Sequence, residues 1–164
     1  MFVDVIPFKQ AAWRLSFMCS CSCTHPGNWE ACQLDLFLVD DGKTLGVRRL
    51  ALNKLTDSCA KELASTVSTN QSLMHLNLGG NSFTDRSVSS LLHLIRTCKS
   101  LQEIDLNDNY LGDSGVRFLC ETLMNPDCKI ERLGLWRNQF SSNGARQLES
   151  LRSLRPNLFV YINW

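Results

Sequence analysis

The chain contains three stretches in which apolar and polar positions follow one another in the same order. Residues 73–83 read LMHLNLGGNSF, residues 101–111 read LQEIDLNDNYL, and residues 130–140 read IERLGLWRNQF. All three fit L-x-x-L-x-L-x-x-N-x-L, with Ile or Phe allowed for Leu, and their start positions give a nearly constant spacing. A regular period of this length indicates a repeat architecture. The central anchors are Leu76, Leu78 and Asn81, then Ile104, Leu106 and Asn109, then Leu133, Leu135 and Asn138.

The segments between these copies have the apolar spacing of helices. Apolar residues recur there at i, i+3, i+4 and i+7, which is one stripe of a helix. The two stripes are Val88, Leu91, Leu92 and Ile95, and then Val116, Leu119, Cys120 and Leu123. The pairs Thr84-Asp85 and Asp113-Ser114 precede them and can accept hydrogen bonds from the first turn. Each unit is therefore predicted to be a strand, an asparagine turn and a helix, and stacked units bury their apolar faces jointly.

An earlier copy precedes the three regular ones. Asn53 and Leu55 lie one full period before Asn81 and Phe83, but Leu50 and Leu52 lie less than a full period before the next strand leucines. We interpret this difference as two missing residues between strand and asparagine, and expect a distorted first turn.

A partial copy follows the regular ones. Ala145, Leu148, Leu151 and Leu154 form a helix stripe that Pro156 ends. The run NLFVYINW then predicts a closing strand with Leu158, Val160 and Ile162 pointing inward.

The repeats resemble leucine-rich repeats of the ribonuclease-inhibitor type. The run FLCETLMNPDCKIERLGLWRN, residues 118–138, is similar to the C-terminal repeats of the NACHT, leucine-rich-repeat and pyrin-domain (NOD-like receptor) proteins. The resemblance implies an α/β fold, a short right-handed β/α solenoid with parallel strands on its concave face and helices outside. The repeat domain is expected at residues 45–164, with about four repeats and a closing strand. In this family the repeats form a partner-sensing surface or a cover over the nucleotide-binding domain.

Other features of that family are missing from the printed sequence. It has no Gly-x-x-x-x-Gly-Lys-Ser/Thr phosphate loop, so nucleotide binding is not carried over. We expect a fragment or short isoform of a longer protein. A net charge of +1 favours neither nucleic acid nor membrane as a partner. The sequence has no run of 18 apolar residues, so no membrane span is predicted. Asp4, Lys9 and Arg14 interrupt any apolar core of a signal peptide. A cytoplasmic location is expected.

Residues 1–44 match no repeat and are expected to be a poorly ordered leader. Their cysteines and histidine are the residue types that bind zinc. The C-x-C-x-C spacing and the lack of a second ligand pair argue against a zinc site, and we predict no metal. The segment Gln33–Val39 could add one strand to the N-terminal edge of the solenoid. The candidate ligands are Cys19, Cys21, Cys23, His25 and Cys32.

The remaining candidates for chemistry are explained by the repeat. Cys120 lies in a helix stripe, where small buried thiols are common, and Cys98 and Cys128 directly precede strands. His25, His75 and His93 have no nucleophile at a recognised motif spacing. The repeated asparagines are expected to bond the backbone of their turns. The sequence therefore predicts no enzyme and no cofactor.

The outward positions of the strands form columns across the predicted sheet. His75, Glu103 and Arg132 form one column, Asn77, Asp105 and Gly134 the next, Gly79, Asn107 and Trp136 a third, and Gly80, Asp108 and Arg137 lie at the rim. Strands ~4.8 Å apart allow Glu103 and Arg132 to pair, and Gly134 is expected to leave room for Trp136. Two interpretations of Trp136 stay open: it covers the end of the core, or it belongs to a binding patch. The predicted patch contains Trp136, Arg137, Glu103, Asp105, Asn107, Asp108, Arg132 and His75.

These expectations favour a non-enzymatic module that binds a protein through its concave face. Trp and Arg are enriched among residues that dominate interfaces, and acidic neighbours favour a basic partner. The resemblance implies a role in innate immune or inflammatory signalling, with a separate partner or with contacts inside a longer parent protein. The alternatives are a ribonuclease-inhibitor-like binder of a basic protein and a purely structural cap of a longer solenoid.

Overall fold

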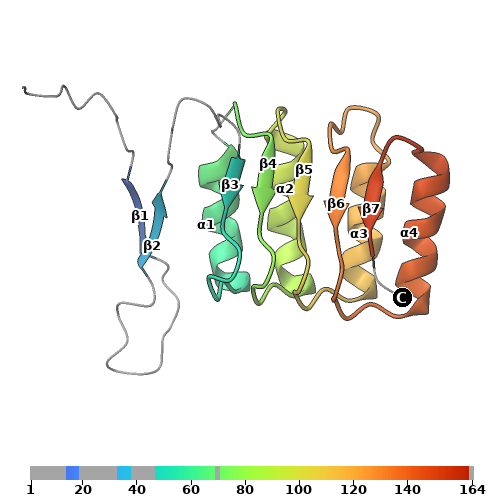
Figure 1. Ribbon diagram of the computed structural model, residues 1–164, viewed down its shortest axis with the longest axis horizontal. Coiled ribbons are helices and arrows are strands. Elements are labelled where there is room, and N and C mark those ends of the chain that lie inside the picture. The colour runs from blue at the N-terminus through green and yellow to red at the C-terminus, as the bar shows by residue number, and fades with distance from the viewer. Residues whose placement is uncertain (1–13, 19–32, 38–46, 69–70, 163–164) are drawn as a thin grey trace, which may run out of the picture.

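The computed structural model describes residues 14–18, 33–37, 47–68 and 71–162 (Figure 1). Short strands alternate with helices along most of this chain. The elements are β1 (Arg14–Met18), β2 (Gln33–Phe37), β3 (Val47–Arg49), α1 (Asp57–Ser68), β4 (His75–Asn77), the 3₁₀ turn η2 (Asp85–Ser87), α2 (Val88–Thr97), β5 (Glu103–Asp105), α3 (Asp113–Leu123), β6 (Arg132–Gly134), α4 (Ser142–Leu154) and β7 (Phe159–Tyr161).

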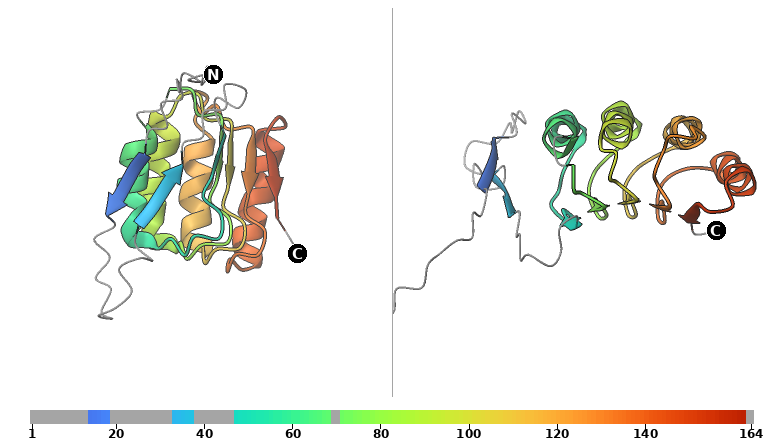
Figure 2. Two further views of the ribbon diagram at one scale, coloured as in Figure 1. Left: turned by 60° about the vertical axis from the view of Figure 1, so that its left-hand side comes forward. Right: turned by 90° about the horizontal axis from the view of Figure 1, so that it is seen from above.

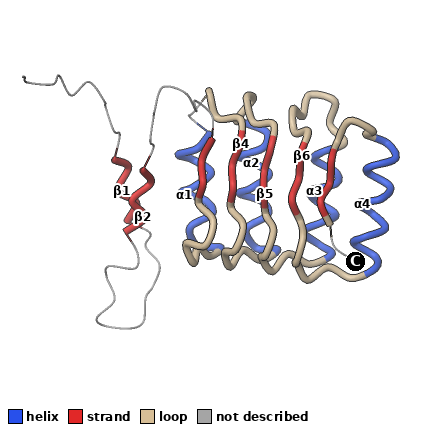
Figure 3. Tube along the Cα trace, in the orientation of Figure 1, coloured by secondary structure: helices blue, strands red, loops and turns tan. Residues whose placement is uncertain are grey.

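Strands β3 to β7 form one parallel sheet in chain order. Parallel neighbours need a crossover connection, and each helix supplies one. Seen from above, the strands stand in a closely spaced row and the helices in a wider row on the other side (Figure 2). The tube in Figure 3 shows the same two layers, strands on one side and helices behind them. The predicted α/β solenoid of leucine-rich repeats is confirmed.

The core fills the space between these two layers. The strand anchors Leu76, Ile104 and Leu133 are at most 1% exposed. The second anchors Leu78 and Leu106 are fully buried, and so is Leu135. Apolar residues of all four helices pack against them in one continuous cluster. Stacked repeats therefore bury jointly what no single repeat could bury alone.

The repeated asparagines bond backbone groups, as predicted, and they also join neighbouring repeats. Asn109 Nδ2 donates to the carbonyl of Leu106 in its own repeat, at 3.2 Å, and to that of Leu78 in the preceding repeat, at 3.1 Å. Asn109 Oδ1 accepts from the Phe83 N–H at 3.0 Å. Asn81 and Asn138 make equivalent bonds. Since buried backbone groups need partners, these side chains hold successive turns together.

Aspartates at the starts of the helices form a second set of links between repeats. Asp57 accepts from the Thr84 N–H, Asp85 from the Gly112 N–H and Asp113 from the Ser141 N–H, each at 2.7 Å. We predicted that Asp85 and Asp113 cap their own helices, but these hydrogen bonds reach the following repeat. Thr84 does cap its own turn, accepting from the Arg86 N–H at 3.3 Å.

The first copy has no missing residues, which corrects the sequence-based alignment. Arg48 pairs with Leu76 in the strand register, so Leu50 is equivalent to Leu78 and not to Leu76. Leu52 then corresponds to Gly80, and both have left-handed backbones, with φ of 61° and 65°. Leu52 is 81% exposed and is not a core anchor. The turn nevertheless differs from later ones, because Asn53 is exposed whereas Asn81 and Asn109 are buried.

Part of the leader predicted for residues 1–44 forms strands. β1 and β2 pair antiparallel in a separate two-stranded sheet. The prediction that the segment starting at Gln33 extends the solenoid edge is therefore wrong, since β2 pairs with β1 and not with β3. The cysteines and histidine of residues 19–32 lie outside the described residues, as do residues 38–46.

The C-terminal copy is folded as the sequence predicted. Helix α4 ends at Leu154, just before Pro156. Leu158 and Val160 are buried, and Ile162 packs against the core. β7 pairs with β6 and forms the C-terminal edge of the sheet.

Candidate functional site

The first column of outward residues on the concave face is linked by charge. The strand register places His75, Glu103, Arg132 and Phe159 side by side. Glu103 Oε2 lies 2.9 Å from His75 Nδ1 and accepts from Arg132 Nε at 2.7 Å. The predicted pairing of Glu103 with Arg132 is confirmed.

The ionisation of Glu103 follows from this setting. Partial burial raises the pKa of the Glu103 carboxyl, but the hydrogen bonds and charges of Arg132 and His75 outweigh it and leave the pKa below its usual range. Glu103 is therefore an anion already neutralised by its neighbours at neutral pH.

The second and third columns meet around Gly134. Asp105 Oδ1 accepts from the Asn107 N–H at 2.9 Å, and Asn107 Oδ1 accepts from the Trp136 N–H at 2.6 Å. A Cβ at Gly134 would lie 2.7 Å from Asp105 Oδ1 and 2.9 Å from the Asn107 amide. The space at Gly134 thus accommodates Asp105 and Asn107, and the expectation that it also leaves room for Trp136 stays a prediction. Asn107 in turn positions the backbone of Trp136.

Trp136 and Arg137 form a stacked pair at the rim of the sheet. The guanidinium carbon of Arg137 lies 4.3 Å from the centre of the Trp136 ring, within the range of a cation–π interaction. Arg137 also donates to Asp108 Oδ1 at 3.4 Å. Trp136 is 37% exposed and is not a member of the core cluster. The indole therefore leaves a substantial surface open next to two charged side chains.

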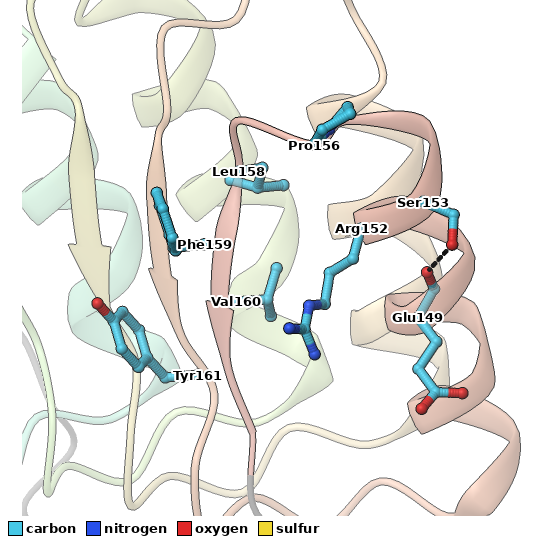
Figure 4. A pocket seen from close by; sticks show the side chains of 8 residues that line it. All are labelled: Glu149, Arg152, Ser153, Pro156, Leu158, Phe159, Val160 and Tyr161. Atoms are coloured by element: carbon cyan, nitrogen blue, oxygen red, sulfur yellow. Dashed lines mark hydrogen bonds between the residues drawn. The ribbon is translucent and has the colours of Figure 1, made fainter.

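Two further aromatic residues belong to this face and were not among the predicted site residues. Phe159 and Tyr161 stand beside Arg132 and Gly134 in the strand register. They are 61% and 54% exposed, whereas Val160 between them is buried, and both project from β7 toward the β6 side of the sheet (Figure 4). The alternation in the closing strand was the signal that could have identified them. We call Trp136, Phe159 and Tyr161 the aromatic patch.

The charges of the concave face are more balanced than the sequence suggested. Glu103 pairs with Arg132, and Asp108 pairs with Arg137. Asp105 differs, because within the described part of the chain it has no cation at ion-pair distance. The acidic character predicted for this face is therefore concentrated on Asp105.

The cysteines of the repeats are placed as structural residues. Cys59 and Cys98 are buried, and Cys120 and Cys128 are half-buried. Burial, with a smaller effect of Glu121, raises the pKa of the Cys120 thiol to about 11. The thiolate is the nucleophilic form of cysteine, so Cys120 is poorly suited to catalysis at neutral pH. Among the described residues, no three or more His, Cys, Asp or Glu side chains are grouped closely enough to hold a metal ion. None of the helices in the described residues is long and apolar enough to span a membrane.

Comparison with known proteins agrees with the repeat pattern. A family model described as "Leucine Rich repeat" matches residues 69–92 and 97–120. The bovine (Bos taurus) "NACHT, LRR and PYD domains-containing protein 3" is 33% identical over 104 residues, which are 63% of this chain and 7% of the relative. The human (Homo sapiens) protein of the same name is 32% identical over an equal span. The match thus spans a small part of these curated relatives. The chain carries leucine-rich repeats that resemble those of the NACHT, LRR and PYD domains-containing proteins.

Proposed function

We propose that the solenoid is a non-enzymatic module that binds a protein partner through its concave face. The observation that carries the proposal is the exposed Trp136–Arg137 pair beside Phe159 and Tyr161. None of these four side chains is a core anchor of the repeat. Large aromatic groups left open to water cost free energy that a partner can recover on binding.

The charged and aromatic groups of the concave face also indicate which kind of partner surface it would bind. Since Glu103 and Asp108 already have arginine partners, the carboxylate available to a partner is that of Asp105. A lysine or arginine of the partner would pair with Asp105, and apolar groups around it would cover the aromatic patch. The partner is therefore a protein surface that is basic at one point and apolar around it. Complementary charges of this kind mainly set the association rate and the register.

The cellular role we propose follows from the relatives. The repeats resemble those of proteins named for NACHT, LRR and PYD domains, and the resemblance implies regulation of innate immune or inflammatory signalling in the cytoplasm. The partner on this view is a component of such signalling or another region of a longer parent protein.

The test compares two aromatic residues that each stack on an arginine. Trp136 stacks on Arg137 on the concave side, and Phe118, 42% exposed, stacks on Arg117 on helix α3 at 4.8 Å. Partners captured by the wild-type chain are identified by mass spectrometry and measured by titration. Trp136→Ala should weaken binding by about 2 kcal/mol, roughly thirtyfold, as for a hot-spot residue. The matched control Phe118→Ala should bind as the wild type does, and both variants should keep the wild-type circular dichroism spectrum.

Two outcomes would contradict the proposal. If Trp136→Ala and Phe118→Ala weaken binding equally, the concave face has no special role. If the folded wild-type chain captures no partner, the alternative of a structural cap within a longer solenoid is favoured instead.

A further inference from the structure

Tyr110 is an exposed aromatic residue whose ring the repeat does not require. Its side chain is 50% exposed, and it directly follows Asn109 in the turn after β5. At the equivalent position the preceding repeat has Ser82 and the following repeat has Gln139, so small or polar residues suffice there. Tyr110 is also outside the core cluster. The fold therefore does not account for the presence of this ring.

The turns that carry Tyr110 and Trp136 are direct neighbours. The turns that follow the strands form a row along one end of the solenoid, the lower end in Figure 1. In this row the Asp108 N–H donates to the Trp136 carbonyl at 2.8 Å. Consecutive Cα atoms are ~3.8 Å apart and neighbouring strands ~4.8 Å apart, so the Cα atoms of Tyr110 and Trp136 are separated by no more than about 13 Å.

An ion pair joins the same two turns. Asp108 precedes Tyr110 by two residues, and Arg137 follows Trp136 directly. Arg137 donates to Asp108 Oδ1 at 3.4 Å and stacks on the Trp136 ring at 4.3 Å. Each of the two charges thus has its counter-charge within the turns. A partner that contacts this surface therefore gains little from charge and more from apolar groups that cover the rings.

The backbone that carries the two aromatic residues is held in place by hydrogen bonds. The Tyr110 N–H donates to the Phe83 carbonyl at 2.9 Å, and the Trp136 N–H donates to Asn107 Oδ1 at 2.6 Å. A surface that is already ordered costs less conformational entropy on binding than a mobile loop. Tyr, Trp and Arg are also the residue types enriched among those that dominate interfaces. The two turns present all three types on an ordered backbone.

We propose that the binding surface continues from the concave face over these two turns and that Tyr110 contacts the partner there. We call Asp108, Tyr110, Trp136 and Arg137 the turn surface. The inference rests on the proposed function, because it names a further contact of the same partner. That partner is a protein that places a basic side chain on Asp105 and a neutral, apolar segment across the turn surface.

Affinity measurements compare Tyr110→Ala with two matched variants. The probe is the recombinant form of the protein that the wild-type chain captures, titrated against the full chain. Tyr110→Ala should raise the dissociation constant about fivefold or more, as for a residue that contributes to an interface. Tyr110→Phe keeps the ring and should bind nearly as well as the wild type. Phe118→Ala truncates the exposed aromatic residue of α3 and should bind as the wild type does.

The salt dependence tests the neutral character of the contact. Salt screens interactions between exposed charges, so the loss of affinity in Tyr110→Ala should be the same at about 0.05 M and about 0.5 M salt. Asp105→Asn should instead weaken binding mainly at the lower salt concentration. A Tyr110→Ala effect that disappears at high salt would contradict a neutral contact.

Photocrosslinking tests the contact in an otherwise wild-type chain. The photoreactive residue p-benzoylphenylalanine is placed at position 110, 136 or 118, and circular dichroism checks that each chain is folded. Positions 110 and 136 should each form a covalent product with the partner, identified by peptide mass spectrometry. Position 118 should form none. This measurement decides the question even if Tyr110→Ala unfolds.

Failure of the inference can be told apart from failure of the proposed function. The inference is overturned if Trp136→Ala weakens binding while folded Tyr110→Ala binds as the wild type does, or if position 136 forms a crosslink and position 110 does not. The partner then stays on the concave face. If Trp136→Ala has no effect either, or if the wild-type chain captures no partner, the proposed function is wrong and the inference falls with it.

Discussion

Replacement of Asn109 by alanine is the sharpest test of what holds the repeats together. Asn109 is 3% exposed and lies in the central turn. Its amide donates to the carbonyls of Leu78, Leu106 and Asn107, and its oxygen accepts from the Phe83 N–H at 3.0 Å. The substitution removes all four bonds.

The consequences for the four backbone groups differ. The Leu78 carbonyl keeps a bond from Asn81 Nδ2 at 2.8 Å, the Leu106 carbonyl keeps one from Asn138 Nδ2 at 2.9 Å, and the Asn107 carbonyl keeps the Gly80 N–H. Only the Phe83 N–H loses its acceptor. A buried orphan donor costs about 1–3 kcal/mol, and the other lost bonds add about 1 kcal/mol. We therefore expect Asn109→Ala to lower the free energy of unfolding by about 2–4 kcal/mol.

The assay is equilibrium denaturation by urea, with two other asparagines for comparison. Asn138 makes similar bonds but is only partly buried, and Asn53 is exposed with one local side-chain bond. The expected order of destabilisation is Asn109→Ala, then Asn138→Ala, then Asn53→Ala, the last below about 0.5 kcal/mol. Asn109→Leu keeps the volume but not the bonds, and should cost about as much as Asn109→Ala. Equal losses at all three positions, or full rescue by Asn109→Leu, would refute the hydrogen-bond account.

Three further predictions concern the core, the charged column and the rim. Leu106→Ala removes a fully buried central anchor and should lower the free energy of unfolding by about 2–5 kcal/mol in the same assay. The lowered pKa of Glu103 means that its contribution is present above its unfolded-state pKa and is lost as pH falls through its folded-state pKa. Glu103→Gln should therefore reduce the loss of stability measured by denaturation below about pH 4.5, and an unchanged acid slope would contradict this. Arg137→Gly should change stability by less than about 1 kcal/mol, because relief of a left-handed backbone offsets the added freedom of the unfolded chain. It should nevertheless weaken partner binding in the titration used for Trp136→Ala, and equal binding would remove Arg137 from the site.

The architecture could be predicted because each anchor residue has the same structural role in every repeat. A leucine at the strand centre and an asparagine in the turn are required by burial and by orphan backbone groups. Their coincidence at one period therefore predicts parallel strands and stacked helices. The pairing of Glu103 with Arg132 followed from the same register.

Two kinds of sequence-based prediction failed. In one, a residue had the type expected of a core anchor but occupied another position, and in the other the hydrogen-bond partner lay in the next repeat. Leu52 looks like an anchor, yet it occupies an exposed left-handed turn position, and Arg48 occupies a strand centre where an apolar residue was expected. For this reason the alignment by periodicity matched Leu50 to Leu76, two residues away from its true equivalent Leu78. Asp85 and Asp113 look like caps of their own helices, and only the stacking of repeats shows that they reach the next one.

The left-handed turn positions bear on the binding surface that we propose. Leu52, Gly80, Asp108 and Arg137 occupy one equivalent site, with φ between 51° and 65°. Glycine adopts this conformation freely, whereas a side chain there costs about 1 kcal/mol or more. The fold alone would be served by glycine throughout, so the non-glycine residues need another explanation. For Asp108 and Arg137 the explanation lies in the contacts of the side chains. Arg137 donates to Asp108 and stacks on the indole ring of Trp136. Backbone strain retained at a rim that also exposes a tryptophan is the pattern expected of a binding site.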